Sequence, residues 1–183
     1  VFKNYQQPNG ITGGRALGIA QFGTKIALSG FFTGYKGVTA NKLMMINISD
    51  GTIDSTFATN IGTGFSSGPA PFVFKYDDTN MIVHGSTLFN GVTYGGNVLK
   101  ISTSGVIDTS FLGPTISSIG IRVKSMAKLS NGKLIIGRTD SPYVNFLATN
   151  GSSDSTLTTN IGTGPNGQVN AVAVDSEDNI YLG

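Results

Sequence analysis

A fifteen-residue pattern of two apolar runs around a polar break occurs four times, without gaps, along the chain. The copies are Ala16 to Gly30, Pro71 to Gly85, Val123 to Gly137 and Val169 to Gly183. The breaks are rich in Gly, Asn, Asp and Ser, residues that accept positive φ or cap a turn with their own side chains. Two apolar runs joined by such a break are typical of a β-hairpin. We therefore expect four hairpins, each ending at the last glycine of its copy.

A third apolar run follows the first three hairpins and ends in a turn dipeptide. The runs are Leu43 to Ile48, Val98 to Ile101 and Val144 to Leu147, and the dipeptides are Asp50-Gly51, Ser104-Gly105 and Asn150-Gly151. Each dipeptide glycine begins a heptapeptide with the pattern G-x-x-D-[ST]-[ST]-[FL], found at 51–57, 105–111 and 151–157. The Gly-rich segments that come next, 58–64 and 158–164, are nearly identical. Any fourth strand of the repeat is expected there.

The spacing of the hairpin-closing glycines predicts the architecture. Gly30, Gly85, Gly137 and Gly183 lie 55, 52 and 46 residues apart, close to the roughly 40 to 50 residues of a four-stranded propeller blade. Helical repeats are excluded because no window of a dozen residues shows apolar positions at a period of 3.6 without Gly or Pro. The sequence predicts an all-β fold: a β-propeller or partial propeller of roughly 50-residue, four-stranded antiparallel blades.

The whole chain, 1–183, forms a single repeat region in this interpretation. The blades are expected at about 14–64, 70–120 and 121–164, with a partial blade at 167–183. Propellers usually close with four to eight blades. We therefore expect the chain to be part of a larger protein, with the remaining blades in the same chain or in other subunits.

Composition and charge remove several classes of function. Only 12% of residues are charged and the net charge is +2, with Lys and Arg scattered, so no nucleic-acid partner is expected. No run of about 18 apolar residues is present, so no membrane insertion is expected. Cysteine is absent, which removes disulfides, thiolate nucleophiles and Cys-ligated zinc.

Two stretches of the repeat resemble a known family. The turn and strand at Asn131-Gly132-Lys133-Leu134-Ile135-Ile136-Gly137 and the exit Asp50-Gly51-Thr52-Ile53-Asp54-x-x-Phe57 are similar to the delta-60 repeat, a β-propeller family of bacterial surface or secreted proteins and phage structural proteins. The resemblance covers nearly all of residues 14 to 183. It implies a propeller without enzymatic activity, in an extracellular, cell-surface or virion-surface location.

The repeated carboxylates Asp54, Asp108 and Asp154 are the first candidates for chemistry. They could bind calcium or act as acids, or they could accept backbone N–H bonds and stabilise the exit from the third strand. Because a device present in every blade is architectural, we interpret the three aspartates as structural repeat positions. Gly30, Gly85 and Gly137 are interpreted in the same way.

Other polar residues give no catalytic or metal site. Asp77-Asp78 and Asp175-Ser176-Glu177-Asp178 carry enough oxygen atoms for calcium but lack the spacing of a known loop, so they are predicted to be turns. His84 is the only histidine, which excludes a two-histidine zinc site. It is predicted to be a tolerated strand residue, in the same place as Ser29, Ile136 and Leu182. No catalytic residue, metal or cofactor is predicted.

Aromatic residues mark the loops after the hairpins. Phe32 and Tyr35 lie in the first such loop, and Phe89 and Tyr94 in the second. They could stack on sugars or form a protein hot spot, or they could fold down over a sheet edge. We predict a non-enzymatic propeller module of an exposed protein that binds a protein or glycan receptor. The alternative is part of a carbohydrate-active enzyme whose catalytic residues lie in other blades.

Overall fold

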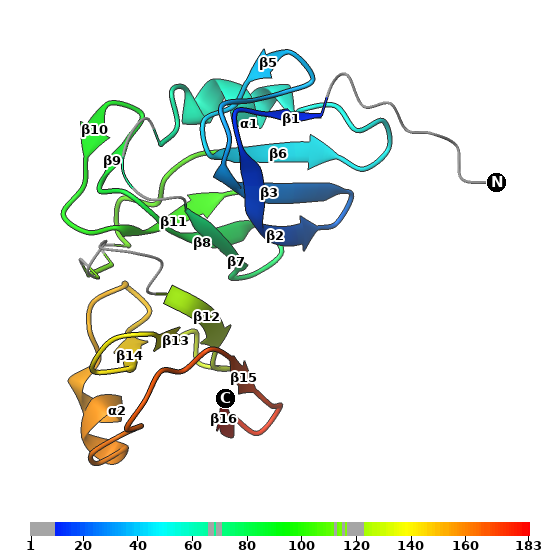
Figure 1. Ribbon diagram of the computed structural model, residues 1–183. Coiled ribbons are helices and arrows are strands. Elements are labelled where there is room, and N and C mark those ends of the chain that lie inside the picture. The colour runs from blue at the N-terminus through cyan, green and yellow to red at the C-terminus, as the bar shows by residue number, and fades with distance from the viewer. Residues whose placement is uncertain (1–9, 66–67, 69–70, 112, 115, 117–122) are drawn as a thin grey trace.

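Three antiparallel three-stranded sheets and one two-stranded hairpin make up the repeat (Figure 1). The computed structural model describes residues 10–65, 68, 71–111, 113–114, 116 and 123–183. Unit 1 contains β2 (Arg15–Phe22), β3 (Lys25–Phe31) and β6 (Leu43–Asn47); unit 2 contains β7 (Phe72–Lys75), β8 (Asn80–His84) and β11 (Val98–Ser102); unit 3 contains β12 (Val123–Lys128), β13 (Leu134–Arg138) and β14 (Val144–Leu147); the C-terminal hairpin contains β15 (Val172–Val174) and β16 (Ile180–Leu182). The middle strand of each unit pairs with both others. The predictions of an all-β fold, four hairpins and three third strands are confirmed.

The prediction that any fourth strand lies in residues 58–64 and 158–164 is wrong. Residues 58–64 and 158–164 instead contain most of two short helices, α1 (Ser55–Ile61) and α2 (Ser155–Asn160). Among the described residues, the pairing that follows each third strand is a single bridge, at Ile46–Ile53, Ile101–Ile107 and Leu147–Ser153. In units 1 and 3 a helix capped by Asp54 or Asp154 begins directly after the bridge.

Two loops form small hairpins that project from units 1 and 2. β4 (Gly34–Tyr35) pairs with β5 (Val38–Thr39) and with β1 (Ile11–Thr12), while β9 (Leu88–Phe89) pairs with β10 (Val92–Thr93). In the first turn φ is 48° at Lys36 and 79° at Gly37, and in the second it is 47° at Asn90 and 74° at Gly91. Positive φ at both central residues is the type I′ turn, which suits the twist of a two-residue hairpin.

Apolar side chains on alternating strand positions fill the space between successive units. Core 1, between units 1 and 2, contains Ala27, Leu43, Met45, Phe57, Ile61, Phe65, Val73, Met81, Val83, Phe89, Leu99 and Ile101. Core 2, between units 2 and 3, includes Ile82, Val98, Phe111, Leu134, Ile136 and Leu147. Core 3, between unit 3 and the C-terminal hairpin, includes Ile135, Val144, Phe146, Val169 and Val172. The sheets of units 2 and 3 therefore have one face toward the preceding unit and one toward the next, whereas the second face of the unit 1 sheet packs with Phe32 and Ala40 of its own loop.

The alignment of unit 3 with the other units by its closing glycine is off by one residue. In each middle strand the residue opposite the start of the third strand is followed by one whose N–H donates to the carbonyl of the residue before the third strand. These bonds run from Gly30 to Lys42, from Gly85 to Asn97 and from Arg138 to Tyr143. Arg138 therefore occupies the place of Gly30 and Gly85, and the equivalence predicted for Gly137 is wrong.

Gly137 lies opposite the first residue of its third strand, Val144, as Ser29 lies opposite Leu43 and His84 opposite Val98. The equivalent residues are thus Ser29, His84 and Gly137, and not Ile136 as predicted. Strand pairing sets the register, whereas the ungapped alignment followed residue type.

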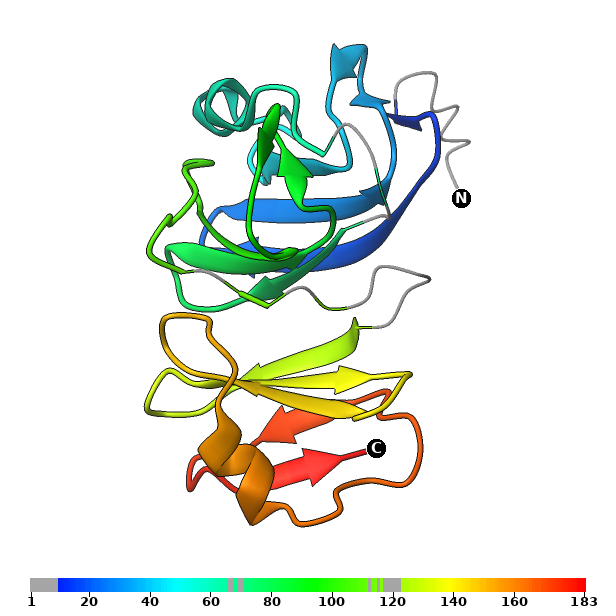
Figure 2. The ribbon, with the colours of Figure 1, turned by 90° about the vertical axis from the view of Figure 1, so that its left-hand side faces the viewer.

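The units are arranged in two groups. β2 of unit 1 packs beside β7 of unit 2, and β12 of unit 3 packs beside β15 of the hairpin. β7 and β12 lie apart in both views, so units 1 and 2 form an upper group and unit 3 with the hairpin a lower one (Figures 1 and 2). None of the helices in the described ranges is long and apolar enough to cross a membrane.

Candidate functional site

The repeated aspartates lie at the exits of the third strands and bind both backbone and lysine. Asp54 accepts the backbone N–H of Phe57 at 2.8 Å and pairs with Lys25 at 2.6 Å. Asp154 accepts the N–H of Thr156 at 3.0 Å and pairs with Lys133 at 2.6 Å. Both carboxylates cap the helix that follows. This is the geometry of a structural device.

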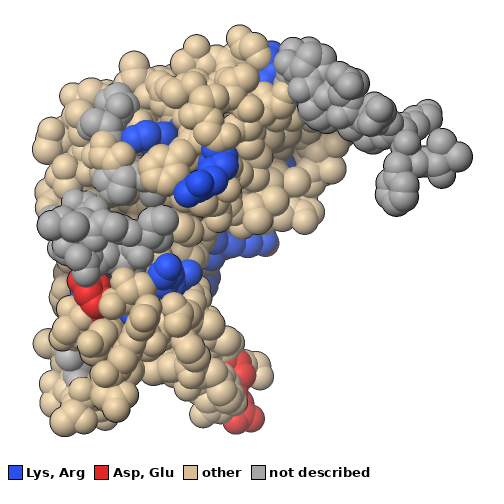
Figure 3. Space-filling view, in the orientation of Figure 1, with Lys and Arg blue, Asp and Glu red and all other residues tan. Residues whose placement is uncertain are grey.

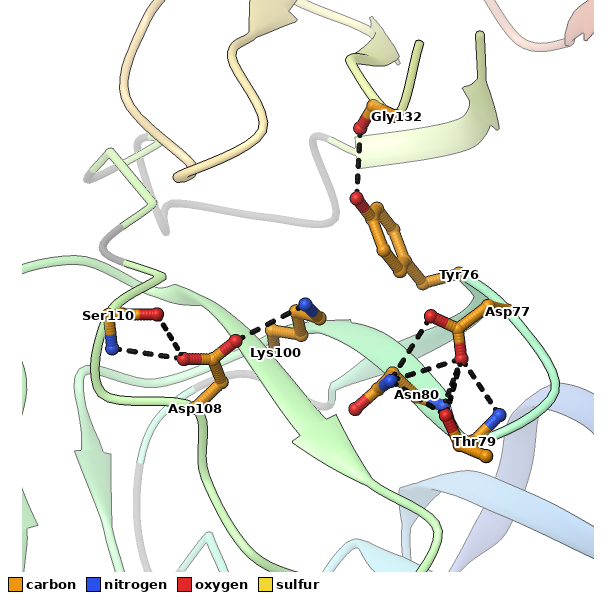
Figure 4. A network of polar contacts seen from close by, with 8 residues as sticks. All are labelled: Tyr76, Asp77, Thr79, Asn80, Lys100, Asp108, Ser110 and Gly132. Carbon is orange, nitrogen blue, oxygen red and sulfur yellow. Dashed lines mark hydrogen bonds and ion pairs between the residues drawn. The ribbon is translucent and has the colours of Figure 1, made fainter. Parts of the chain in front are cut away.

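Asp108 of unit 2 makes the same contacts without a helix (Figure 4). It accepts the backbone N–H of Ser110 at 3.0 Å and pairs with Lys100 at 3.2 Å. The hydrogen bond from the Ser110 hydroxyl lowers the pKa of Asp108 despite some desolvation, and the hydrogen bond from Lys100 lowers it further. The pKa of Asp154 is lowered in the same way, first by the Lys133 ammonium. A carboxyl held ionised in this way is unsuited to act as a general acid near neutral pH.

In the turns that contain Asp77 and Asp175, the aspartate carboxylate accepts hydrogen bonds from backbone N–H groups of the same turn. Asp77 accepts hydrogen bonds from the backbone N–H groups of Thr79 and Asn80, both at 2.8 Å (Figure 4). Asp175 accepts the N–H groups of Glu177 and Asn179, both at 2.9 Å, and bonds to the Asn179 side chain and backbone lower its pKa to about 2. No group of three or more His, Asp or Glu side chains that could hold a metal ion occurs in the described residues.

His84 lies buried at the junction of units 2 and 3. Its side chain is 3% exposed and its Nε2 atom has no hydrogen-bond partner. Burial, together with the positive charge of Arg138, lowers its pKa from 6.5 to about 4. The imidazole is therefore neutral at physiological pH.

The four loop aromatics divide into two buried and two partly exposed rings. Phe32 is 1% exposed, and Phe89 is 2% exposed and packs edge-to-face on Phe65 with the centroids 4.8 Å apart. Tyr35 and Tyr94 are half-buried, and the Tyr35 hydroxyl donates to the carbonyl of Gly51 at 3.2 Å. Both phenylalanine rings are used in packing, and the two tyrosines are the more exposed members of the set.

A shallow groove beside the β9–β10 hairpin brings Tyr94 together with residues of α1 and of the unit 2 exit turn. Its volume is about 240 Å³. Its walls are Asn60, Phe89, Asn90, Val92, Tyr94, Gly105, Val106, Ile107 and Thr109. Val92 and Val106 are 52% and 55% exposed. We refer to this set as the hairpin groove.

The chemistry of the hairpin groove is neutral. Its lining has two amides, a phenol, a hydroxyl and apolar surface, but no charged side chain. The Asn60 amide nitrogen donates to the Ser104 carbonyl at 2.8 Å, and the Asn90 side-chain oxygen accepts from the backbone N–H of Thr63 at 3.1 Å. These bonds position both amides, and they leave the Asn60 side-chain oxygen as an acceptor and the Asn90 side-chain nitrogen as a donor.

Sequence reasoning found Phe89 and Tyr94 but missed the other residues of the groove. The Asn90-Gly91 dipeptide is a local hairpin signal and could have placed Val92 at an exposed tip. Asn60 and Val106 carry no such signal, because they come from the preceding helix and the following turn. Phe32 and Tyr35 belong to the unit 1 hairpin and do not line the groove.

Comparison with known proteins gives only distant structural similarity. No family model matches the chain, and no curated protein matches it. It is similar to two structures of the extracellular domain of BT4673 from B. thetaiotaomicron, described in one as a one-component system and in the other as a hybrid two-component system. The identities are 17% and 16%, and the TM-scores 0.42 and 0.49. Each alignment covers 92% of this chain and 26% of the other, so the chain spans about a quarter of those structures.

Proposed function

We propose that the chain is a β-propeller-type, non-enzymatic interaction module of an exposed protein, and that it binds a neutral receptor through the hairpin groove. The propeller assignment is supported by the roughly 50-residue period and by the stacking of units through cores 1 to 3. The exposed location follows from the resemblance to the delta-60 repeat. The observation that carries the binding assignment is the uncharged groove, with its two positioned amides beside Tyr94 and exposed valines.

The states of the carboxylates support a non-enzymatic role. All ten acidic residues lie in the described ranges, and nine of them accept hydrogen bonds or ion pairs from neighbouring groups. The tenth, Glu177, is exposed on the turn between β15 and β16. A glycoside hydrolase needs two carboxyl groups facing one another across a substrate site, and no carboxyl group lines the hairpin groove.

The test is binding of the chain to an array of neutral oligosaccharides and to uncharged peptides immobilised on the same surface. Val92→Asp should abolish binding to whichever oligosaccharide or peptide the wild-type chain binds, because the substitution places a charge in a neutral groove. Tyr94→Ala should weaken binding by about tenfold or more, the usual range for an aromatic contact.

The unit 1 hairpin offers a matched control. Val38 is 50% exposed at the same place in its hairpin as Val92, so Val38→Asp should leave binding unchanged. Equal binding by the wild type and by Val92→Asp would remove the hairpin groove from the proposal. Cleavage of a polysaccharide by the chain, lost on substitution of one carboxylate, would favour the enzyme alternative.

A further inference from the structure

The hairpin groove is formed inside the repeat, where unit 1 meets unit 2. Its walls come from α1, from the β9–β10 hairpin and from the exit turn of unit 2, residues 104–109. The exit turn is fixed against α1, because the Asn60 amide donates to the Ser104 carbonyl at 2.8 Å. A side-chain carbon added at Gly105 would lie only 2.7 Å from the carbonyl oxygen of Phe57. One wall of the groove is therefore held rigidly by the packing of the two units.

The small hairpin of unit 1 is tied to its own exit turn. The Tyr35 hydroxyl donates to the Gly51 carbonyl at 3.2 Å, and the Lys36 ammonium donates to the same carbonyl at 2.9 Å. Phe89 and Asn90 occupy the places of Tyr35 and Lys36 in the unit 2 hairpin. A phenylalanine carries no hydroxyl and an asparagine is shorter than a lysine, so unit 2 lacks the side chains that make this tie.

The unit 2 hairpin is held by unit 1 instead. The backbone N–H of Asn90 donates to the Gly64 carbonyl at 2.8 Å, and the Asn90 side-chain oxygen accepts the N–H of Thr63 at 3.1 Å. The ring of Phe89 packs on Phe65. Both the hairpin and the exit turn are thus fixed by contacts with unit 1, and a groove shaped before binding saves the ligand the cost of ordering it.

The polar groups of the groove include both donors and acceptors without charge. Asn60 offers its side-chain oxygen as an acceptor, Asn90 offers its side-chain nitrogen as a donor, and the Thr109 hydroxyl can do either. A ligand with several neighbouring hydroxyl groups can pair with all three, because each hydroxyl donates and accepts. A charged ligand would lose water without gaining a counter-charge, which is unfavourable.

The apolar part of the groove is small. Val92 and Val106 are 52% and 55% exposed, and the half-buried Tyr94 packs partly on core 1. The volume of about 240 Å³ is below the roughly 300 to 1,000 Å³ of a pocket for a drug-sized ligand. A sugar ring has one apolar C–H face and a rim of hydroxyl groups, so about one or two rings of a longer saccharide match this surface in size and polarity.

We propose that the hairpin groove binds the neutral, polyhydroxylated rings of an oligosaccharide; this rests on the proposed function and names its ligand class. A peptide fits the groove less well. Strand addition needs a longer edge than the two residues of β10, and a bound helix needs several apolar anchors spaced along one face. The exposed apolar side chains among the lining residues are only Val92 and Val106.

The probes are neutral tetrasaccharides of glucose, galactose or mannose, each titrated into the chain by isothermal calorimetry. At least one should bind saturably. The corresponding uronates, in which a carboxylate replaces each hydroxymethyl group, should bind at least about tenfold more weakly, because the carboxylate meets no positive charge in the groove.

Two substitutions test the polar contacts. Thr109→Val should weaken saccharide binding about threefold to tenfold, the usual range for one hydrogen bond. Asn90→Asp should weaken it at least about tenfold, because a charge replaces the donor, while the turn and the acceptor for Thr63 are kept. The matched control is Thr93→Val in the same hairpin, which lies outside the groove lining and should bind like the wild type. Thermal unfolding should change little in all three, since these side chains are exposed.

Three results would overturn the inference: no saturable binding of any of the tetrasaccharides, equal binding of the uronates, or wild-type affinity in both Thr109→Val and Asn90→Asp. Binding of an uncharged peptide that Val92→Asp abolishes, without binding of a saccharide, would keep the proposed function and replace the saccharide by a peptide. Binding of neither probe would reject both.

Discussion

Two junctions of the repeat differ in the size of the residues at equivalent positions. The junction between units 1 and 2 has small residues where the junction between units 2 and 3 has large ones. At the first junction Gly18 of β2 lies so close to β7 that an added side-chain carbon would be 3.0 Å from the backbone nitrogen of Val73. The equivalent residue of unit 2 is Phe72, since each lies opposite the residue that pairs with the start of the third strand. A glycine lets two strands approach, and a phenylalanine keeps them apart.

The next pair of positions repeats the contrast. At the first junction the two positions hold Ser29 of unit 1 and Gly85 of unit 2. At the second junction the position of Ser29 holds His84 of unit 2, and the position of Gly85 holds Arg138 of unit 3. Arg138 is 7% exposed and is held by Asp140 at 2.7 Å and Asn145 at 2.6 Å. At these positions the second junction therefore carries larger and more polar side chains than the first.

The junction of unit 3 with the C-terminal hairpin resembles the first. Ser125, the equivalent of Gly18, accepts the backbone N–H of Val172 at 3.1 Å and so holds β12 and β15 side by side. Only the middle junction departs from the pattern. A residue type that differs in one copy of a repeat indicates a local role that the architecture does not require.

The largest expected effect concerns His84. Its folded-state pKa of about 4 lies below the unfolded value of 6.5, so the contribution to stability is complete above pH 6.5 and is lost as pH falls from 6.5 to 4. The loss is about 3 kcal/mol in the free energy of unfolding. Urea unfolding at a series of pH values measures it.

His84→Ser, which introduces the residue of unit 1, serves as the control. It should flatten the pH dependence between pH 4 and 6.5, because the titrating group is gone. If the variant kept the slope of the parent, other groups would be responsible for it.

Gly18→Ala should test the close approach at the first junction. The added carbon would lie 2.5 Å from the Ser29 hydroxyl and 3.0 Å from Val73 nitrogen, so we expect a loss of about 1 to 3 kcal/mol, as for other overpacked sites. Gly167→Ala, where nothing lies within 4 Å, should change the urea midpoint little. Equal midpoints for the two variants would contradict a close strand contact.

Asp54→Ala should cost about 1 kcal/mol, because it removes the cap of α1 as well as the pair with Lys25. Asp108→Ala should cost less, since Thr109 and Ser110, which follow it directly, form a turn and not the start of a helix. Thermal unfolding of the two variants compares these exits. A larger effect at Asp108 would mean that capping contributes nothing to the difference.

Tyr76→Phe gives the smallest effect. The Tyr76 hydroxyl donates to the Gly132 carbonyl at 3.0 Å and so links unit 2 to unit 3 (Figure 4). Its loss should cost about 0.5 to 1 kcal/mol, while Lys100 and Lys128 keep their places near the ring. If the loss of unfolding free energy in Tyr76→Phe became larger at high salt, the contacts of the two lysines with the ring would be responsible instead of the hydroxyl.

Surface charge contributes little to the differences between the junctions of the repeat. Lys and Arg are scattered singly over a mostly neutral surface on the face shown in Figure 3. Surface ion pairs contribute little to stability on their own. Packing and backbone approach at the junctions therefore dominate the comparison.

The sequence by itself determined the hairpins and third strands. Their limits agree with the apolar runs to within a few residues, because alternation of side chains and turn chemistry act over neighbouring residues. Asn90-Gly91 and Asp50-Gly51 mark turns for the same local reason. The period of about 50 residues likewise follows from the order of the residues alone.

Only the tertiary structure decided the helices, the register of unit 3 and the groove. The seven residues of α1 are too few to be stable alone, and the helix persists because Phe57 and Ile61 are buried in core 1. The shift that replaces Gly85 by Arg138 depends on strand pairing across a turn of different length. The hairpin groove gathers Asn60, Tyr94 and Val106 from three separate elements, and no pattern of neighbouring residues records which distant segments share a surface.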